Sequence, residues 1–137
     1  TILLSTKSNK WKITSEKYKP IEKRRSAPLL TGFVKDWQKA WESGNIDRYI
    51  EYYSSDFSTG KFNRQSWYKD KKEKFDEAKR IQVETSNYKI QSKNKYTWEV
   101  TFDQTYQSDV YSDKGKKLLV IKGRPNNLKI IDEKWWQ

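Results

Sequence analysis

Residues 96–107 alternate between two kinds of side chain, and this alternation constrains the fold more than any other feature. One set of positions holds Tyr96, Trp98, Val100, Phe102, Gln104 and Tyr106, and the other holds Thr97, Glu99, Thr101, Asp103, Thr105 and Gln107. Successive side chains of a β-strand point to opposite faces of a sheet. The segment therefore predicts a long strand with one covered and one wet face, which is typical of antiparallel sheets.

Three further strands are predicted around this one. The segment 81–90 changes parity, because Ile81 and Val83 occupy one face whereas Tyr88 and Ile90 occupy the other. Such a switch predicts a β-bulge, which bends a sheet. The turn sequences "SDKG" and "GRPNN" separate two more strands, "KKLLVIK" at 116–122 and "LKIIDEKWW" at 128–136.

The preceding part of the chain has the periodicity of helices. Apolar residues three and four positions apart predict a helix from about residue 28 to 43, and Gly44 is a suitable C-terminal stop. Asn45 can cap a short second helix, and Asn63 can cap a third that continues to about residue 79. Three helices followed by four long antiparallel strands predict an α+β fold.

Residues 1–28 are interpreted as a separate basic segment. They hold more than half of the net charge of +11 and are predicted to form a β-hairpin over 1–18, then a linker between Pro20 and Pro28. The phrase "NKWKITSEKY" at 9–18 is echoed by "NNLKIIDEKW" at 126–135, at an ungapped offset of 117 residues. We interpret the segment as the remnant of a preceding copy of a tandem domain, and expect the main domain to span 29–137.

These elements resemble the nuclear transport factor 2-like fold, a cone-shaped roll also called cystatin-like. The segment "WQKAWESGNIDRYIEYYSSDF" is similar to the opening helices of that superfamily. The strand patterns Val100-x-Phe102-x-Gln104-x-Tyr106 and Ile130-x-x-Glu133-x-Trp135 are similar to one subgroup. That subgroup is the C-terminal accessory domain of L,D-transpeptidase-like murein enzymes, and the resemblance covers residues 29–137.

The resemblance implies a pocket between the bent sheet and the helices. Gln104 is the informative residue, since a buried amide needs a polar partner. The last strand is expected to present Ile131, Glu133 and Trp135 on one face. The candidate ligand-binding residues are Tyr53, Trp67, Phe102, Gln104, Tyr106, Lys117, Glu133 and Trp135.

A structural role is the alternative for each of these residues. The aromatic side chains can fill the core, and Gln104 can pair internally with Glu133. Tyr49, Tyr52 and Tyr53 are expected to pack with their hydroxyls at the rim of the pocket. The Lys-rich run 69–74 is expected to be a solvated helix face.

The composition excludes several chemistries. The chain has no Cys and no His, so it has no thiol nucleophile, no disulfide, no His base and none of the usual zinc sites. The transpeptidase's own Cys–His signature and a His–Asp dehydratase site are therefore absent. We expect no cofactor and no metal.

The leading hypothesis is a non-catalytic ligand-binding or scaffolding domain of a bacterial cell-envelope protein, linked to peptidoglycan modification. Its expected partners are a glycan or peptidoglycan fragment, or a cell-wall enzyme, in the periplasm or envelope. An isomerase- or cyclase-type enzyme with Tyr106 and Glu133 or Asp103, and a protein–protein assembly module such as a homodimer, are the alternatives. No recognised nucleic-acid motif accompanies the charge, and no apolar run is long enough to span a membrane.

Overall fold

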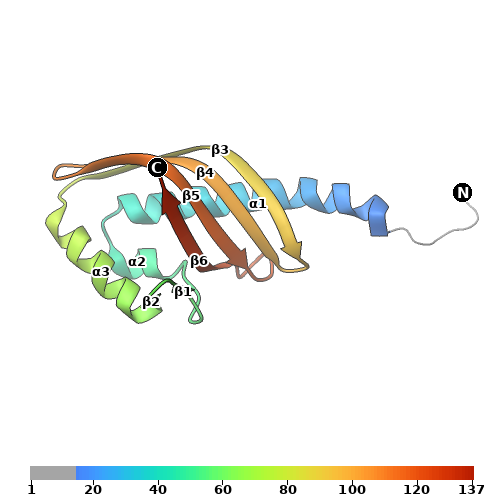
Figure 1. Cartoon of the computed structure of the whole chain (residues 1–137), viewed down its shortest axis with the longest axis horizontal. Helices are drawn as coiled ribbons and strands as arrows, with labels where there is room; N and C mark the ends of the chain where they lie inside the picture. The colour runs from blue at the N-terminus through green and yellow to red at the C-terminus, as the bar shows by residue number, and fades with distance from the viewer. Residues whose placement is uncertain (1–14) are drawn as a thin grey trace, which may run out of the picture. The chain divides into compact units, whose positions relative to one another are not determined.

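The computed structural model describes residues 15–137, with side chains from Ser26 onward (Figure 1). The elements in chain order are α1 (Ser15–Glu42), α2 (Ile46–Ile50), β1 (Ser58–Thr59), β2 (Phe62–Asn63), α3 (Arg64–Glu77), β3 (Ile81–Asn94), β4 (Thr97–Ser108), β5 (Ser112–Lys122) and β6 (Lys129–Trp136). The long strands form one antiparallel sheet in the order β3-β4-β5-β6, and β1 pairs with β2 separately. The predicted α+β fold is confirmed.

Helix α1 begins much earlier than the sequence predicts. It runs through the predicted linker and includes both Pro20 and Pro28. The interval has no glycine and is rich in Lys, Arg and Glu, which are good helix formers. Because residues 15–18 are helical, the predicted hairpin cannot reach Tyr18, and its remainder lies outside the described residues. The chain divides into two compact units between Leu30 and Thr31, a point inside α1.

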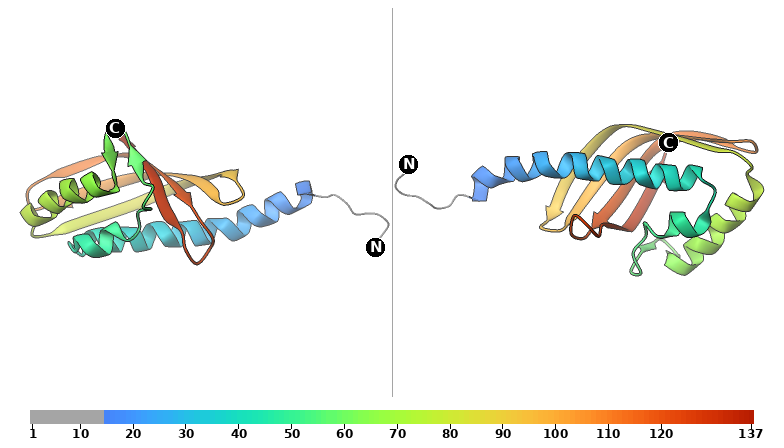
Figure 2. Two further views of the ribbon diagram at one scale, coloured as in Figure 1. Left: turned by 90° about the horizontal axis from the view of Figure 1, so that it is seen from below. Right: turned by 180° about the vertical axis from the view of Figure 1, so that it is seen from behind.

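The later part of α1 packs against one face of the sheet (Figure 2). Val34, Trp37 and Ala40, at three-residue spacing, are fully buried. The ring of Trp37 meets that of Phe102 on β4 edge-on, with centroids 6.0 Å apart. Val100, Phe102, Leu119 and Ile121 complete this face. The covered face of the central strand is therefore the one that the alternation predicts.

Two bulges set which side chains reach the covered face. The register of β3 on β4 shifts between Ser86 and Lys89, where Asn87 has a φ of 57°. This confirms the predicted bulge at the parity switch. A second shift lies in β6, where Ile130 pairs with Ile121 but Asp132 pairs with Val120. Ile130 is therefore the buried residue beside Glu133, which corrects the expected grouping of Ile131 with Glu133.

Helix side chains and loop backbone cover the sheet edges. On β3, Val83 donates its N–H to Glu42 at 2.9 Å and accepts from the amide of Gln38 at 2.6 Å. On β6, Ile130 exchanges backbone hydrogen bonds with Tyr52 and Ser54 at 2.8 and 2.9 Å. These contacts satisfy edge groups that would otherwise be open to pairing with another chain.

The caps that begin the short helices agree with prediction. Asn45 accepts hydrogen bonds from the N–H groups of Asp47 and Arg48 at the start of α2. Asn63 forms a capping box with Ser66 at the start of α3. Figure 1 shows α3 below the turn that joins β4 to β5. Residues of α3 and of this turn line a cavity at this end of the domain.

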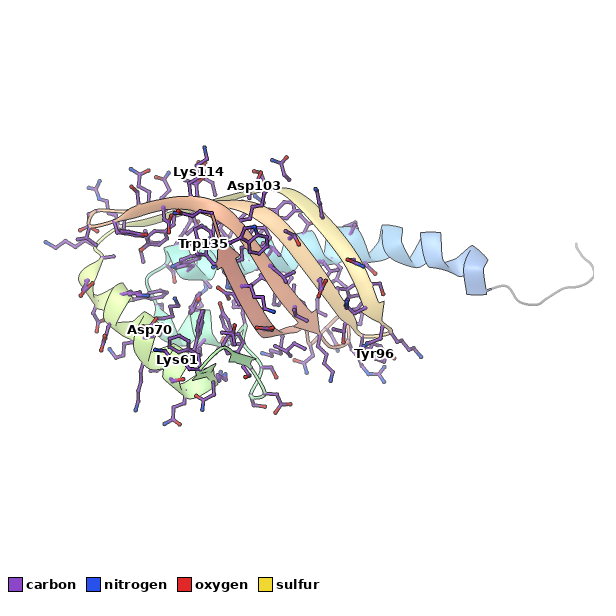
Figure 3. All side chains as sticks on the ribbon, in the orientation of Figure 1. Lys61, Asp70, Tyr96, Asp103, Lys114 and Trp135 are labelled. Carbon is purple, nitrogen blue, oxygen red and sulfur yellow. The ribbon has the colours of Figure 1, made fainter. Side chains whose placement is uncertain are left out.

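The outer face of the sheet is polar. Asp103 and Lys114 project from it, away from the helices (Figure 3). Asp103 accepts hydrogen bonds from Asn87 at 2.7 Å and Lys116 at 2.6 Å, and these two contacts lower the pKa of its carboxyl. Asp103 therefore lies on the wet face, as its position in the alternation predicts, and cannot pair with Tyr106 across the strand.

Candidate functional site

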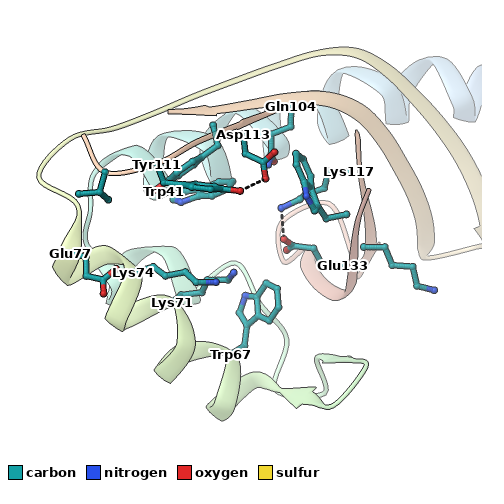
Figure 4. A pocket seen from close by; sticks show the side chains of 14 residues that line it. Trp41, Trp67, Lys71, Lys74, Glu77, Gln104, Tyr111, Asp113, Lys117 and Glu133 are labelled. Atoms are coloured by element: carbon teal, nitrogen blue, oxygen red, sulfur yellow. Dashed lines mark hydrogen bonds and ion pairs between the residues drawn. The ribbon is translucent and has the colours of Figure 1, made fainter. Parts of the chain in front are cut away.

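A cavity of about 550 Å³ lies between α3 and the covered face of the sheet (Figure 4). Six of the predicted pocket residues line it, namely Trp67, Gln104, Tyr106, Lys117, Glu133 and Trp135. Tyr53 and Phe102 do not line it. Phe102 packs in the core on Trp37, and Tyr53 supports Glu133 from behind. The structure thus brings residues from α3, β4, β5 and β6 to one place.

Further residues line the cavity that the sequence analysis did not single out, chiefly Trp41, Lys71, Lys74, Glu77, Val110, Tyr111 and Asp113. Trp41 stacks on Tyr106, with centroids 5.1 Å apart and planes 28° apart. Lys71 lies one helical turn after Trp67, so the two share a helix face. That spacing is a signal which could have placed Lys71 in the pocket beside the predicted Trp67.

The carboxylate of Glu133 is held by a buried hydrogen-bond network. Tyr53 donates its hydroxyl to Oε1 at 2.6 Å, and Lys117 Nζ pairs with Oε2 at 2.7 Å. Because the Tyr53 proton goes to Glu133, Tyr49 donates to Tyr53 across 2.7 Å. Trp37 Nε1 donates to the same hydroxyl at 3.0 Å. Each carboxylate oxygen therefore already accepts a hydrogen bond from the protein.

The two tyrosine hydroxyls are buried in the interior, which corrects their expected position at the pocket rim. Tyr49 is 1% and Tyr53 2% exposed. Burial and then the Glu133 charge raise the pKa of both phenols well above the ordinary value. Both hydroxyls are therefore protonated donors at any physiological pH.

Lys117 lies among indole rings as well as beside Glu133. Its Nζ is 5.5 Å from the ring centroid of Trp37, 5.1 Å from Trp41 and 5.5 Å from Trp135. A cation over aromatic faces is attracted by the ring quadrupoles. The Lys117–Glu133 ion pair thus joins β5 to β6 at the floor of the cavity, and three tryptophan rings surround Lys117.

Gly115 on β5 leaves room for the Trp135 side chain. A Cβ at this position would lie 3.0 Å from the Trp135 ring and 2.5 Å from the carbonyl oxygen of Trp136. Only a residue without a side chain allows this approach. The position of the Trp135 wall therefore depends on a glycine in the neighbouring strand.

Gln104 is buried at the cavity without its full set of hydrogen bonds. Its side chain is 3% exposed, and Oε1 has no hydrogen-bond partner among the described residues. The predicted internal pair with Glu133 does not form, because Tyr53 and Lys117 hold that carboxylate. A buried amide oxygen without a partner costs about 1–3 kcal/mol, unless something in the cavity bonds to it.

Lys71 is a largely buried cation at the cavity, with 19% of its side chain exposed. This corrects the expectation that the run 69–74 is uniformly solvated. Its Nζ lies 4.3 Å from the centroid of the Trp67 ring, and its nearest carboxylate, Asp70, is 3.6 Å away. Burial lowers the pKa of Lys71 to about 8, although the Glu133 charge acts in the opposite direction.

The turn between β4 and β5 forms one rim of the cavity. Its apolar residues Val110 and Tyr111 are 61% and 59% exposed. Tyr111 donates its hydroxyl to Asp113 at 2.9 Å, and Asp113 also accepts from Gln137 at 2.6 Å. An exposed aromatic residue at a pocket rim is available to pack on a ligand.

Within residues 15–137, the described side chains include no group of three or more Asp, Glu, His or Cys that could hold a metal ion. None of the helices in that range is long and apolar enough to cross a membrane.

The fold has clear relatives. A family model of the Cds6 C-terminal NTF2-like domain matches residues 29–134. The chain belongs to this family. We call this chain the Cds6-type domain. Among solved structures, Bd1075 of Bdellovibrio bacteriovorus is similar to it, with 30% sequence identity and a TM-score of 0.73, over 90% of this chain and 42% of that protein.

Two other likenesses show the NTF2-like fold alone. The helical cell shape determining protein Pgp2 of Campylobacter jejuni is 20% identical, with a TM-score of 0.68, over 77% of this chain and 39% of Pgp2. A protein named as a putative scytalone dehydratase, from Novosphingobium aromaticivorans, is 11% identical with a TM-score of 0.68, over 88% of this chain and 86% of that one. A comparison with curated proteins found no match. The Cds6-type domain thus spans less than half of the two bacterial proteins named first.

Proposed function

We propose that this domain is a non-catalytic binding module of a bacterial cell-envelope protein and that it holds a peptidoglycan fragment in the cavity. One observation carries the proposal. A cavity walled by Trp41, Trp67 and Trp135 presents the buried Gln104 amide, whose Oε1 has no partner among the described residues. Aromatic walls with a few convergent polar groups are typical of binding sites for sugars, peptides and other small ligands.

The non-catalytic part of the proposal rests on Glu133. A general base must come within hydrogen-bond reach of the proton that it takes from the substrate. In this domain one oxygen accepts from Tyr53 and the other pairs with Lys117. Asp103, the other carboxylate considered for an enzyme, lies on the outer face of the sheet. Both carboxylates are thus engaged in structural contacts.

The envelope location is supported by resemblance. The strand pattern is similar to accessory domains of murein enzymes, and one structural relative is named as a cell shape determining protein. The proposal concerns the domain and leaves the partner domains of a longer protein open.

A titration of the protein with purified disaccharide-peptide fragments, followed by NMR, tests the function. We expect chemical-shift changes at Gln104 and the tryptophan indoles, and binding about tenfold weaker in Gln104→Ala because a hydrogen bond is lost. Thr105→Ala, the next residue of β4 and on the outer face, is the matched control and should bind as the parent does. Equal binding by Gln104→Ala would place the site elsewhere, and no binding to any fragment would refute the function.

A further inference from the structure

The lysines of the cavity differ in how well they are paired. Lys117 lies 2.7 Å from Glu133, Lys74 lies 3.2 Å from Asp70, and Lys134 lies 3.8 Å from Asp132. The Lys134 side chain is 62% exposed, so water compensates its charge. The Lys71 side chain is only 19% exposed, and its nearest carboxylate is the same Asp70, at 3.6 Å, which already pairs with Lys74. Among the described cavity residues, Lys71 is therefore the buried cation with the weakest compensation.

A buried charge without a close partner is unfavourable for the folded protein. Here the cost is visible in the lowered pKa of Lys71, whose main cause is burial. An anionic group in the cavity could pair with the ammonium more closely than Asp70 does, because Asp70 lies 3.6 Å away and is shared with Lys74. Lys71 reaches from α3 toward the cavity, with Glu133 and Lys117 on the opposite wall (Figure 4).

Gln104 adds a second requirement. Its carboxamide can both accept and donate, and its Oε1 is unpartnered at 3% exposure. An amide group of a ligand can donate its N–H to Oε1 and accept from the Gln104 amide nitrogen. The stacked rings of Trp41 and Tyr106 offer a flat apolar surface on which an amide plane or a short side chain can lie.

We propose that the cavity recognises the peptide part of its ligand: a free carboxylate pairs with Lys71, and an adjacent amide group pairs with Gln104. The ligand class is an N-acylated amino acid or short peptide with a free carboxyl end. This inference rests on the proposed function and specifies which part of the peptidoglycan fragment enters the cavity. A neutral sugar would bring no negative charge to Lys71 beyond that of Asp70, which Lys71 shares with Lys74.

The groups that face Lys71 predict the pH dependence of this recognition. They are Asp70 and Lys74 on α3, Lys117 on β5 and Glu133 on β6. A carboxylate ligand binds the ammonium form, which in the free protein is lost as the pH rises through about 8. Preference for a carboxylate is therefore expected at pH 7 and should decline by pH 9.5.

The experiment measures the affinity of the whole chain for four probes. The first is N-acetyl-alanyl-alanine, as the L,L and as the D,D stereoisomer, and the second is its C-terminal amide. The third is the disaccharide of N-acetylglucosamine, and the fourth is inorganic phosphate. At pH 7 we expect the free acid to bind about tenfold more tightly than the amide, since a hydrogen bond to a charged group is exchanged for a neutral one. The ratio should approach one at pH 9.5.

Variants of two lysines on α3 provide the control. Lys71→Met should remove the preference for the acid. Lys72→Met should keep it, because Lys72 is exposed, pairs with Asp76 at 3.2 Å and does not line the cavity. Lys71→Arg should keep the preference at pH 9.5, because a guanidinium does not lose its proton there.

The possible outcomes distinguish a failure of the proposed ligand class from a failure of the proposed peptidoglycan-binding function. Equal binding of acid and amide, or tighter binding of phosphate or of the disaccharide, would overturn the inference. Disaccharide-peptide fragments that still bind would then leave the proposed function intact. Binding of the acid through Lys71 without binding of any peptidoglycan fragment would support the ligand class and refute the function.

Discussion

At the scale of single residues, two buried lysines differ in how their charge is compensated. Lys117 enters the interior with a carboxylate at 2.7 Å and three indole rings around it. Lys71 enters with one ring and a shared carboxylate at 3.6 Å. A close partner compensates a buried charge, whereas a poorly paired buried charge costs folding free energy. The Lys117 pair is structural, and Lys71 is the cation that we propose to pair with a ligand.

Glu133→Ala should lower the free energy of unfolding by about 3 kcal/mol, since it leaves Lys117 buried and unpaired. Urea denaturation measures this loss. Asp103→Ala is the matched control, because the Lys116–Asp103 pair is as short, at 2.6 Å, but 54% and 39% exposed, and little change is expected. The double variant Glu133→Leu with Lys117→Met should recover most of the loss, and failure to do so would show that the cost is not due to the unpaired charge.

Lys71→Met should stabilise the free protein at pH 7. The folded-state pKa of about 8 lies below the ordinary 10.5, so the unfolded chain binds more protons between these values. Stability therefore rises with pH across that window, and the penalty, on the order of 3 kcal/mol, is fully present below pH 8. Urea denaturation of parent and variant at pH 7 and 9.5 tests this. A variant that is less stable at pH 7, or an advantage that does not shrink by pH 9.5, would contradict the assignment.

At the scale of elements, side chains alternate between the two faces of the sheet along each strand, and each bulge reverses this alternation. The shift at Ser86 and Lys89 could be predicted because the hydrophobic parity of β3 changes there. The shift in β6 was missed because Ile130 and Ile131 are both apolar, so the pattern shows no change of parity. Glu133 and Trp135 were nevertheless assigned to one face correctly, since both follow the bulge.

Gly115→Ala should displace the Trp135 wall, because the new Cβ would lie 2.5 Å from a backbone oxygen and 3.0 Å from the indole ring. We expect a loss of about 1–3 kcal/mol in the free energy of unfolding, as for other overpacked sites. NMR should also show a shift of the Trp135 indole N–H. Gly32→Ala is the control, since nothing lies within 4 Å of its Cβ and alanine favours the helix. An unchanged Trp135 signal would refute the argument.

At the scale of the whole molecule, the family assignment covers residues 29–134, and the compact unit that holds the pocket begins at Thr31. The interpretation of residues 1–28 as a remnant of a tandem copy stays a prediction, because half of that segment, residues 1–14, lies outside the described residues. The continuation of α1 back to Ser15 could not be foreseen. Two prolines are typical of a linker, and the good helix formers between them outweighed that signal.

The sequence by itself determined the four long strands, the helices α2 and α3, and the part of α1 after residue 28. Strand alternation, the 3.6-residue period of the helices and the Asn caps are properties of neighbouring residues, and local chain geometry converts them directly into structure. The tertiary structure decided the chemistry of the cavity. Tyr53 and Glu133 meet across 80 positions, and Trp41 stacks on Tyr106 across the helix–sheet interface. The four-residue spacing from Trp67 indicates only the helix face on which Lys71 lies. The burial and charge pairing that separate Lys71 from its solvated neighbours depend on the tertiary fold.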